Sequence, residues 1–199
     1  MNFRGIALVS IPILATAFAT VQAANTSRQQ ADIFARKVVE IVDHGEQPKR
    51  RARRTTITET ELNSWFIYRS QALLPEGLTQ PRITIIGNGK LLGGTTIDLD
   101  AIGKRRGTGG AFDLWSYLGG KLPLSLTGVL HTKNGQGRFE LQSADVSGVP
   151  IPKTLLQELL SHYTRSDARP QGYRLEDPFE LPSNIRQIEI GEGQAVVVQ

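Results

Sequence analysis

The stretch Ile57-Thr58-Glu59-Thr60-Glu61-Leu62-Asn63-Ser64-Trp65 carries the strongest local folding signal in this chain of 199 residues. Thr58 and Glu61 have the spacing of a capping box, in which each side chain bonds the backbone N–H of the other residue at a helix N-terminus. Ile57 and Leu62 occupy the two positions of a hydrophobic staple, which fixes how the chain enters the helix. The sequence therefore predicts a helix from Thr58 to about residue 74, ended by the proline and glycine of residues 75–77.

Another helix is predicted upstream, over about residues 25–44, where apolar residues recur with near-helical spacing behind two candidate N-caps, Asn25 and Ser27. A basic cluster follows, expected as a loop or a helix extension, and consists of Lys49, Arg50, Arg51, Arg53 and Arg54. The whole chain has 23 Lys and Arg residues against 19 Asp and Glu residues. The basic pI of about 9.6 therefore reflects one local cluster and not a generally basic protein.

Beyond Pro81 the apolar pattern changes from helical to alternating, which predicts two antiparallel hairpins. Their turns are Gly87-Asn88-Gly89 and Lys133-Asn134-Gly135, because Asn-Gly tolerates the positive φ of a type I′ turn. A broad apolar stripe over residues 151–163 predicts a helix against the sheet, and residues 185–198 predict a last hairpin. This order indicates an α+β protein in which helices cover one face of a curved antiparallel sheet.

The first 23 residues have the features of a signal peptide: a basic start, an apolar middle and the small-residue site Val21-Gln22-Ala23. An uncleaved membrane anchor is the alternative, but the apolar run is shorter than the roughly 20 residues that a spanning helix needs, and Pro12 interrupts it. We predict cleavage near Ala23 and a soluble periplasmic or secreted protein. The chain has no cysteine, which excludes a lipoprotein anchor, thiol catalysis and zinc–thiolate sites.

Catalytic signals are few. His44, His131 and His162 lie on three different predicted elements without metal-ligand spacing, and neither a nucleophile elbow nor a phosphate-binding glycine motif is present. Asp98 and Asp100 would lie about 7 Å apart on one strand face, a separation compatible with acid–base hydrolysis. A solvated strand face explains the pair more simply. We therefore predict no enzymatic activity, no cofactor and no metal, with a hydrolase as the minor alternative.

The basic cluster has several interpretations. The export signal and the lack of interleaved aromatic residues argue against nucleic acid. An anionic membrane surface is better motivated, because each nearby Lys or Arg contributes about 1 kcal/mol of attraction. A solvated loop between two helices, or a site for an extracellular protease, would show the same pattern. The broad apolar helix faces also have two interpretations, because they either fill a dry core or border an apolar groove.

Several segments together resemble exported bacterial proteins. The stretch 57–65, followed by Arg82-Ile83-Thr84-Ile85-Ile86 and Gly94-Thr95-Thr96-Ile97-Asp98-Leu99-Asp100, is similar to the opening helix and strand pair of the LmeA-like and YceB-like families, which are related to the tubular lipid-binding (TULIP-like) fold. Gly148-Val149-Pro150 and the stretch 179–185 add to the resemblance, which covers residues 57–199. It implies a strongly curved antiparallel sheet wrapped around a long helix, a groove for acyl or isoprenoid chains, and no catalytic residues.

We thus expect a signal peptide at residues 1–23, an N-terminal helix and basic linker at 24–56, and a lipid-binding-like domain at 57–199. The expected function is non-enzymatic periplasmic binding or transfer of a phospholipid or isoprenoid-type lipid. The groove between helix and sheet would be lined by Leu62, Trp65, Phe66, Leu73, Leu124, Leu126, Leu155 and Leu159. The anionic head group or membrane surface would meet Lys49, Arg50, Arg51, Arg53, Arg54, Lys104, Arg105 and Arg106. The alternative is an envelope scaffold or protein-interaction module with a filled core and an envelope protein as its partner.

Overall fold

The computed structural model describes residues 25–49, 51–98, 100–101, 120–167 and 169–199, without the side chains of Leu159, His162 and Tyr163. The elements follow in the order α1 (Arg28–Glu46), β1 (Arg54–Thr58), α2 (Glu59–Tyr68), η1 (Gln71–Leu73), β2 (Leu78–Gly87), β3 (Lys90–Asp98), β4 (Lys121–Lys133), β5 (Gln136–Val146), β6 (Val149–Pro150), α5 (Lys153–Thr164), β7 (Phe179–Glu180), β8 (Gln187–Gly191) and β9 (Gln194–Val198). The predicted α+β class is confirmed.

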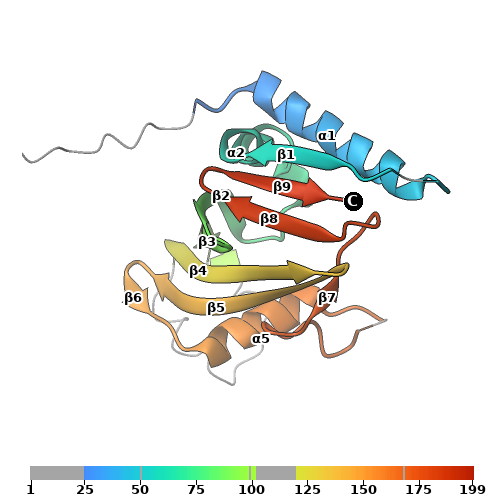
Figure 1. Ribbon diagram of the computed structural model, residues 1–199. Helices are drawn as coiled ribbons and strands as arrows, with labels where there is room; N and C mark the ends of the chain where they lie inside the picture. Colours follow the sequence, from blue (N-terminus) through green and yellow to red (C-terminus); the bar gives the residue numbers. More distant parts are fainter. Residues whose placement is uncertain (1–24, 50, 99, 102–119, 168) are drawn as a thin grey trace, which may run out of the picture.

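The strands form two antiparallel sheets. Sheet A has the order β1-β9-β8, and sheet B has the order β2-β3-β4-β5-β6, with β7 also beside β5. Helix α1 runs beside β1 at one end of the molecule, and α5 lies below β5 at the other end (Figure 1). The two sheets thus lie between α1 and α5.

The predicted wrapping of a strongly curved sheet around a long helix is not found among the described residues. Neither sheet is strongly curled (Figure 1), and α2 ends at Tyr68 instead of residue 74. The helix ends early because side chains take over its last carbonyls: the Ser70 hydroxyl donates to Phe66 O at 2.9 Å, and Gln71 Nε2 donates to Ile67 O at 3.2 Å. Short polar side chains that bond local backbone in this way compete with helix continuation.

The hairpin predictions are confirmed. Asn88 and Gly89 have φ values of 53° and 81°, and Asn134 and Gly135 have φ values of 52° and 81°. Both turns therefore show the paired positive φ of type I′, whose twist matches that of the flanking strands. The last hairpin, β8–β9, also forms where it was predicted.

Strand β1 was not predicted, because its residues Arg54–Thr58 were expected to form the end of a basic loop and the start of a helix. It pairs with β9 along its whole length, from Arg54 opposite Val198 to Thr58 opposite Gln194. Arg53 extends the pairing through two backbone hydrogen bonds with Gln199, at 3.2 and 2.9 Å. The expected boundary between residues 56 and 57 consequently lies inside a strand of sheet A.

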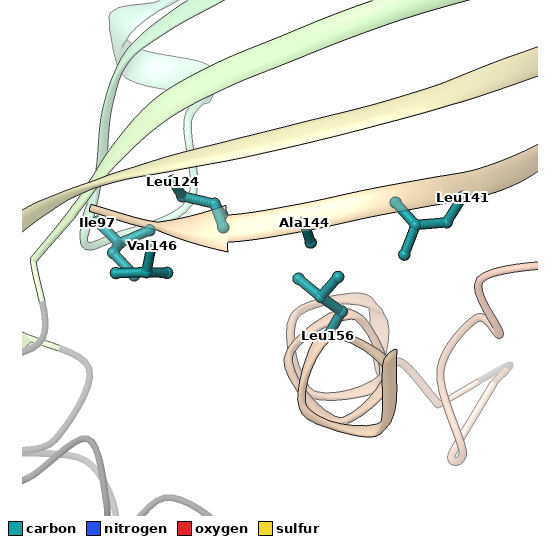
Figure 2. Packing of buried hydrophobic residues seen from close by; sticks show 6 residues of the cluster. All are labelled: Ile97, Leu124, Leu141, Ala144, Val146 and Leu156. Atoms are coloured by element: carbon teal, nitrogen blue, oxygen red, sulfur yellow. The ribbon is translucent and has the colours of Figure 1, made fainter. Parts of the chain in front are cut away.

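Most of the buried apolar side chains among the described residues belong to two clusters. The sheet A cluster joins Ile41 of α1 to Leu181, Ile185 and Val197. The sheet B cluster packs α5 against the sheet, with Leu156 projecting towards Ala144 of β5 (Figure 2). The buried members of the sheet B cluster are Ile97, Leu124, Leu141, Ala144, Val146 and Leu156.

Candidate functional site

The stretch that starts α2 is occupied by structural contacts. The capping box is present, with Thr58 N–H donating to Glu61 Oε2 at 2.9 Å and Glu61 N–H donating to Thr58 Oγ1 at 3.2 Å. The Glu61 carboxylate is buried and also pairs with Lys37 of α1, at 2.7 Å. Ser64 is fully buried and accepts a hydrogen bond from Ser27 N–H, which precedes α1. These side chains tie α2 to α1.

Two further side chains of α2 close the outer edge of β2. Asn63 Nδ2 donates to Ile83 O at 2.7 Å, and Ile83 N–H donates to Asn63 Oδ1 at 2.8 Å. Glu59 Oε2 accepts from Ile85 N–H at 2.7 Å. An uncovered strand edge is a template for unwanted pairing, so the helix acts here in place of a neighbouring strand. Glu59 and Asn63 therefore have architectural roles that sequence reasoning did not assign.

The predicted groove residues fall into two separate places. Trp65 lies against aromatic rings, with centroid distances of 5.5 Å to Phe34 of α1 and 5.7 Å to Phe66, and Leu62 is half-buried on the same helix. Leu73 lies in η1 and is 70% exposed. The members from sheet B and α5, by contrast, belong to the sheet B cluster: Leu124, Leu126 and Leu155. The side chain of Leu159 lies outside the described residues.

The predicted head-group residues are also divided. Arg53 pairs with Glu40, and Arg54 donates to the Glu189 carboxylate of β8 through Nη1 and Nη2. Lys49 and Arg51 are exposed and have no ion-pair partner in the described part of the chain. Four members lie outside the described residues: Arg50, Lys104, Arg105 and Arg106.

The carboxylate pair does not have the geometry that was predicted. Strand β3 ends at Asp98, whose Oδ1 accepts from Ala101 N–H at 3.0 Å, and Asp100 already has helical backbone. The two side chains therefore do not share a strand face. In the described ranges, no group of three or more His, Cys, Asp or Glu residues is placed to hold a metal ion.

An open groove of about 640 Å³ lies between β4 and β8, and we call it the β4–β8 groove. The groove arises because β3 and β4 differ in length. Strand β3 starts at Lys90, opposite Val129 of β4, and the last bond between the two segments joins Leu130 N–H to Gly89 O. The rest of β4, up to Lys133, has no partner from β3. Strand β8 approaches this free edge without pairing to it. The groove is lined by Gly89, Leu130, His131, Thr132, Lys133, Gln136, Gly137, Arg138, Pro178, Gln187, Ile188, Glu189 and Ile190.

Thr132 joins the two sheets at the groove. Its hydroxyl donates to Ile188 O at 2.8 Å and accepts from Ile188 N–H at 2.9 Å. Because backbone groups alternate in direction along a strand, the N–H and C=O of Ile190 also point away from β9 and towards the groove. The groove thus offers backbone hydrogen-bonding groups beside the apolar residues Leu130, Ile188 and Ile190, of which Ile188 also packs against the sheet A cluster.

The rim of the groove carries positive charge. Hydrogen bonding to Arg54 lowers the pKa of Glu189 and raises the pKa of Arg54, so both charges are held in one pair. His131 Nε2 lies 3.1 Å from Glu140 Oε2. Lys133 and Arg138 have no ion-pair partner in the ranges that the structure describes. Both cations can therefore meet an anionic ligand, although Arg138 also acts on Glu176, whose pKa it helps to lower.

Sequence reasoning missed the β4–β8 groove. His131, Lys133 and Arg138 all flank the Asn134-Gly135 turn, so the predicted hairpin already placed them at one end of a strand pair. Strand β8 begins only at Gln187, far along the chain from all three residues, and no local pattern predicts where it lies.

No family model matches this chain, and no curated protein or solved structure is significantly similar to it. The resemblance to the LmeA-like and YceB-like families thus stays a prediction. Of the helices in the described residues, none has the length and apolar character needed to span a membrane.

Proposed function

We propose that this protein is a non-enzymatic binding or transfer protein of the bacterial periplasm that holds an anionic lipid, a phospholipid or an isoprenoid phosphate, at the β4–β8 groove. The observation that carries the proposal is the combination of apolar and cationic side chains around one cavity. Leu130, Ile188 and Ile190 offer contacts for an apolar chain, and Lys133 and Arg138 offer charge to a phosphate.

The dimensions of the groove support this proposal. Its volume of about 640 Å³ lies within the range of roughly 300–1,000 Å³ that is usual for small-molecule sites. Its open shape suits a ligand that is only partly enclosed, such as one or two segments of a chain with its head group at the rim. Arg138 is suited to the head group because a guanidinium bonds phosphate in a bidentate manner.

The basic cluster adds a second, weaker contact with an anionic surface. Lys49 and Arg51 are exposed and unpaired within the described residues, and Arg54 reaches the groove lining through Glu189. At about 1 kcal/mol for each nearby cation, this contact orients the protein on a bilayer and does not fix it there.

The direct test is organic extraction of the purified protein followed by mass spectrometry, together with sedimentation of liposomes of phosphatidylglycerol or of phosphatidylcholine. We expect a co-purified lipid and binding to the anionic vesicles only. Lys133→Ala should weaken both results, and Lys121→Ala is the matched control because this exposed lysine lies at the other end of the same strand. A lipid-free protein that is indifferent to anionic vesicles, or equal losses in both variants, would contradict the proposal.

A protein-interaction module is the second candidate, and one specific observation favours it. The outer edge of β5 is open over part of its length within the described residues.

A further inference from the structure

The open edge of β5 lies between two short strands. At one end β7 pairs with Gln136 and Gly137, and at the other end β6 pairs with Asp145 and Val146. Ile151 N–H donates a hydrogen bond to Ala144 O at 3.0 Å. In the described part of the chain, no strand pairs with this edge over residues 138–143. Sheet B therefore has a gap that is one strand wide and bounded at both ends.

The backbone groups that point into the gap follow from the hairpin register. The type I′ turn at Asn134-Gly135 makes Lys133 and Gln136 a hydrogen-bonded pair, so every second residue of β5 bonds β4. The intervening residues Phe139 and Leu141 direct their N–H and C=O groups outward. Neither residue has a backbone hydrogen bond on that side to any described residue.

A pocket of about 340 Å³ lies along this edge, lined by Arg138, Phe139, Glu140, Leu141, Lys153 and Glu176. Most of its charges already have partners. Lys153 forms an ion pair with Glu176, whose pKa is lowered mainly by that hydrogen bond, and Glu140 lies beside His131. Arg138 forms no ion pair among the described residues, although its charge also contributes to the lowered pKa of Glu176.

Side chains alternate between the two faces of β5. Phe139 and Leu141 belong to the sheet B cluster on the side of α5, and Arg138 and Glu140 lie on the opposite face. A strand added at the edge would share these faces. Its residues on the α5 side would meet apolar neighbours, and its residue opposite Arg138 would meet a guanidinium that forms no ion pair within the described residues.

We propose that this gap binds one extended peptide segment of about six residues, supplied by a partner protein, in which apolar residues alternate with polar ones and one acidic residue faces Arg138. Added strands of this kind obtain affinity from main-chain hydrogen bonds and specificity from alternate side chains. A second copy of this chain does not fit by edge-to-edge pairing. Strands β6 and β7 stand beside β5 at both ends, so the edge of another sheet cannot approach to the strand spacing of about 4.8 Å.

The experiment uses the full chain and acetylated, amidated hexapeptides in which valine alternates with threonine, with aspartate, lysine or no charge at one threonine position. We expect the aspartate peptide to slow amide hydrogen exchange at Phe139 and Leu141, measured by NMR. A peptide with proline in place of the central valine should not do so, because proline removes a ladder donor.

Charge reversal at Arg138 tests whether this residue faces the acidic residue of the peptide. Arg138→Glu should weaken the aspartate peptide about threefold and strengthen the lysine peptide by a similar factor, the range expected for a cross-strand ion pair. Arg36→Glu, on the exposed surface of α1, should change neither affinity. Lys133→Ala should leave peptide binding unchanged, because Lys133 lines the β4–β8 groove and not this pocket, whereas Arg138 lines both. Equal binding of the proline peptide, unchanged exchange at Phe139 and Leu141, or a charge preference that ignores Arg138 would overturn the inference.

Discussion

Different kinds of contact connect the elements at the two ends of the molecule. Around α1, α2 and sheet A, buried polar groups connect distant parts of the chain, as in the Lys37–Glu61 pair and in the bond from Gln199 Nε2 to Ile41 O at 2.8 Å. Around α5 and sheet B, the main connection is an apolar cluster whose buried members among the described side chains include Leu156 of α5.

Because of this difference, the two ends should respond differently to side-chain substitutions. A directional hydrogen bond fixes both distance and orientation, and loss of one partner leaves the other buried and unsatisfied. An apolar contact fixes only proximity, and its loss leaves a cavity that neighbours partly refill. We therefore expect substitutions in the first region to cost more stability for each atom removed.

The largest effect is expected for Glu61→Ala. This change removes the capping box and leaves the Lys37 ammonium without its carboxylate. Loss of one partner of a buried pair costs about 3–5 kcal/mol, and because Lys37 is 26% exposed we expect the lower value, about 3 kcal/mol. Urea unfolding followed by circular dichroism measures it. The control is Glu40→Ala, which removes an exposed pair with Arg53 and should cost about 0–1 kcal/mol. Similar losses of unfolding free energy in the two variants would contradict the expected difference between the buried and the exposed ion pair.

Asn63→Ala should be next. The substitution leaves Ile83 N–H and C=O without their partner at the edge of β2, which costs about 2 kcal/mol of unfolding free energy. Gln71→Ala is the matched control, because that exposed amide makes one local bond to Ile67 O and its loss should cost about 0.5 kcal/mol. If Asn63→Ala were as mild as its control, α2 would not be needed to close this edge.

Leu156→Ala probes the other region. It removes the buried contact of α5 with the sheet B cluster, and we expect about 2 kcal/mol, the low end for such truncations, because α5 can settle towards the sheet. The control is Val149→Ala, whose side chain is 64% exposed and whose loss should be near zero. A loss above that of Glu61→Ala, measured in the same denaturant series, would reverse the comparison.

The smallest effect concerns pH and the Arg54–Glu189 pair. Arg54 lowers the pKa of Glu189 below its ordinary value of 4.5, so the pair stabilises the fold above that value and is lost as pH falls through the lowered pKa. The difference in Tm between the wild-type protein and Glu189→Gln should therefore shrink on acidification. Glu192→Gln, in the exposed β8–β9 turn, should show no such trend. A difference that grew at low pH would contradict this assignment.

Local sequence signals predicted much of the fold. The Thr58–Glu61 capping box and the two Asn-Gly turns each depend on residues a few positions apart, and all three are present. Strand β1 and the early end of α2 were missed. Strand β1 depends on its tertiary pairing with β9, and the early end of α2 depends on the Ser70 and Gln71 side chains bonding its last carbonyls, which the apolar periodicity does not show.

The candidate site was less predictable than the fold. The residues expected to line one groove, among them Trp65 and Leu124, divide between α1–α2 contacts and the sheet B cluster. Leu124 is buried and Trp65 is half-buried, whereas Leu73 is 70% exposed, and periodicity does not specify against which element a side chain packs. The β4–β8 groove depends on the unequal lengths of β3 and β4 and on the position of β8, which only the assembled sheets determine.

The pairing of β1 with β9 has a consequence for the order of folding. The hairpins of sheet B join neighbours in sequence, so they need only short loops to close, whereas Arg54 must find Val198 across most of the chain. Contacts between distant residues form slowly because a long loop has to close first. We expect sheet B to gain protection early in refolding and β1 to remain unpaired until the C-terminal hairpin arrives, which makes the completion of sheet A the last and slowest step.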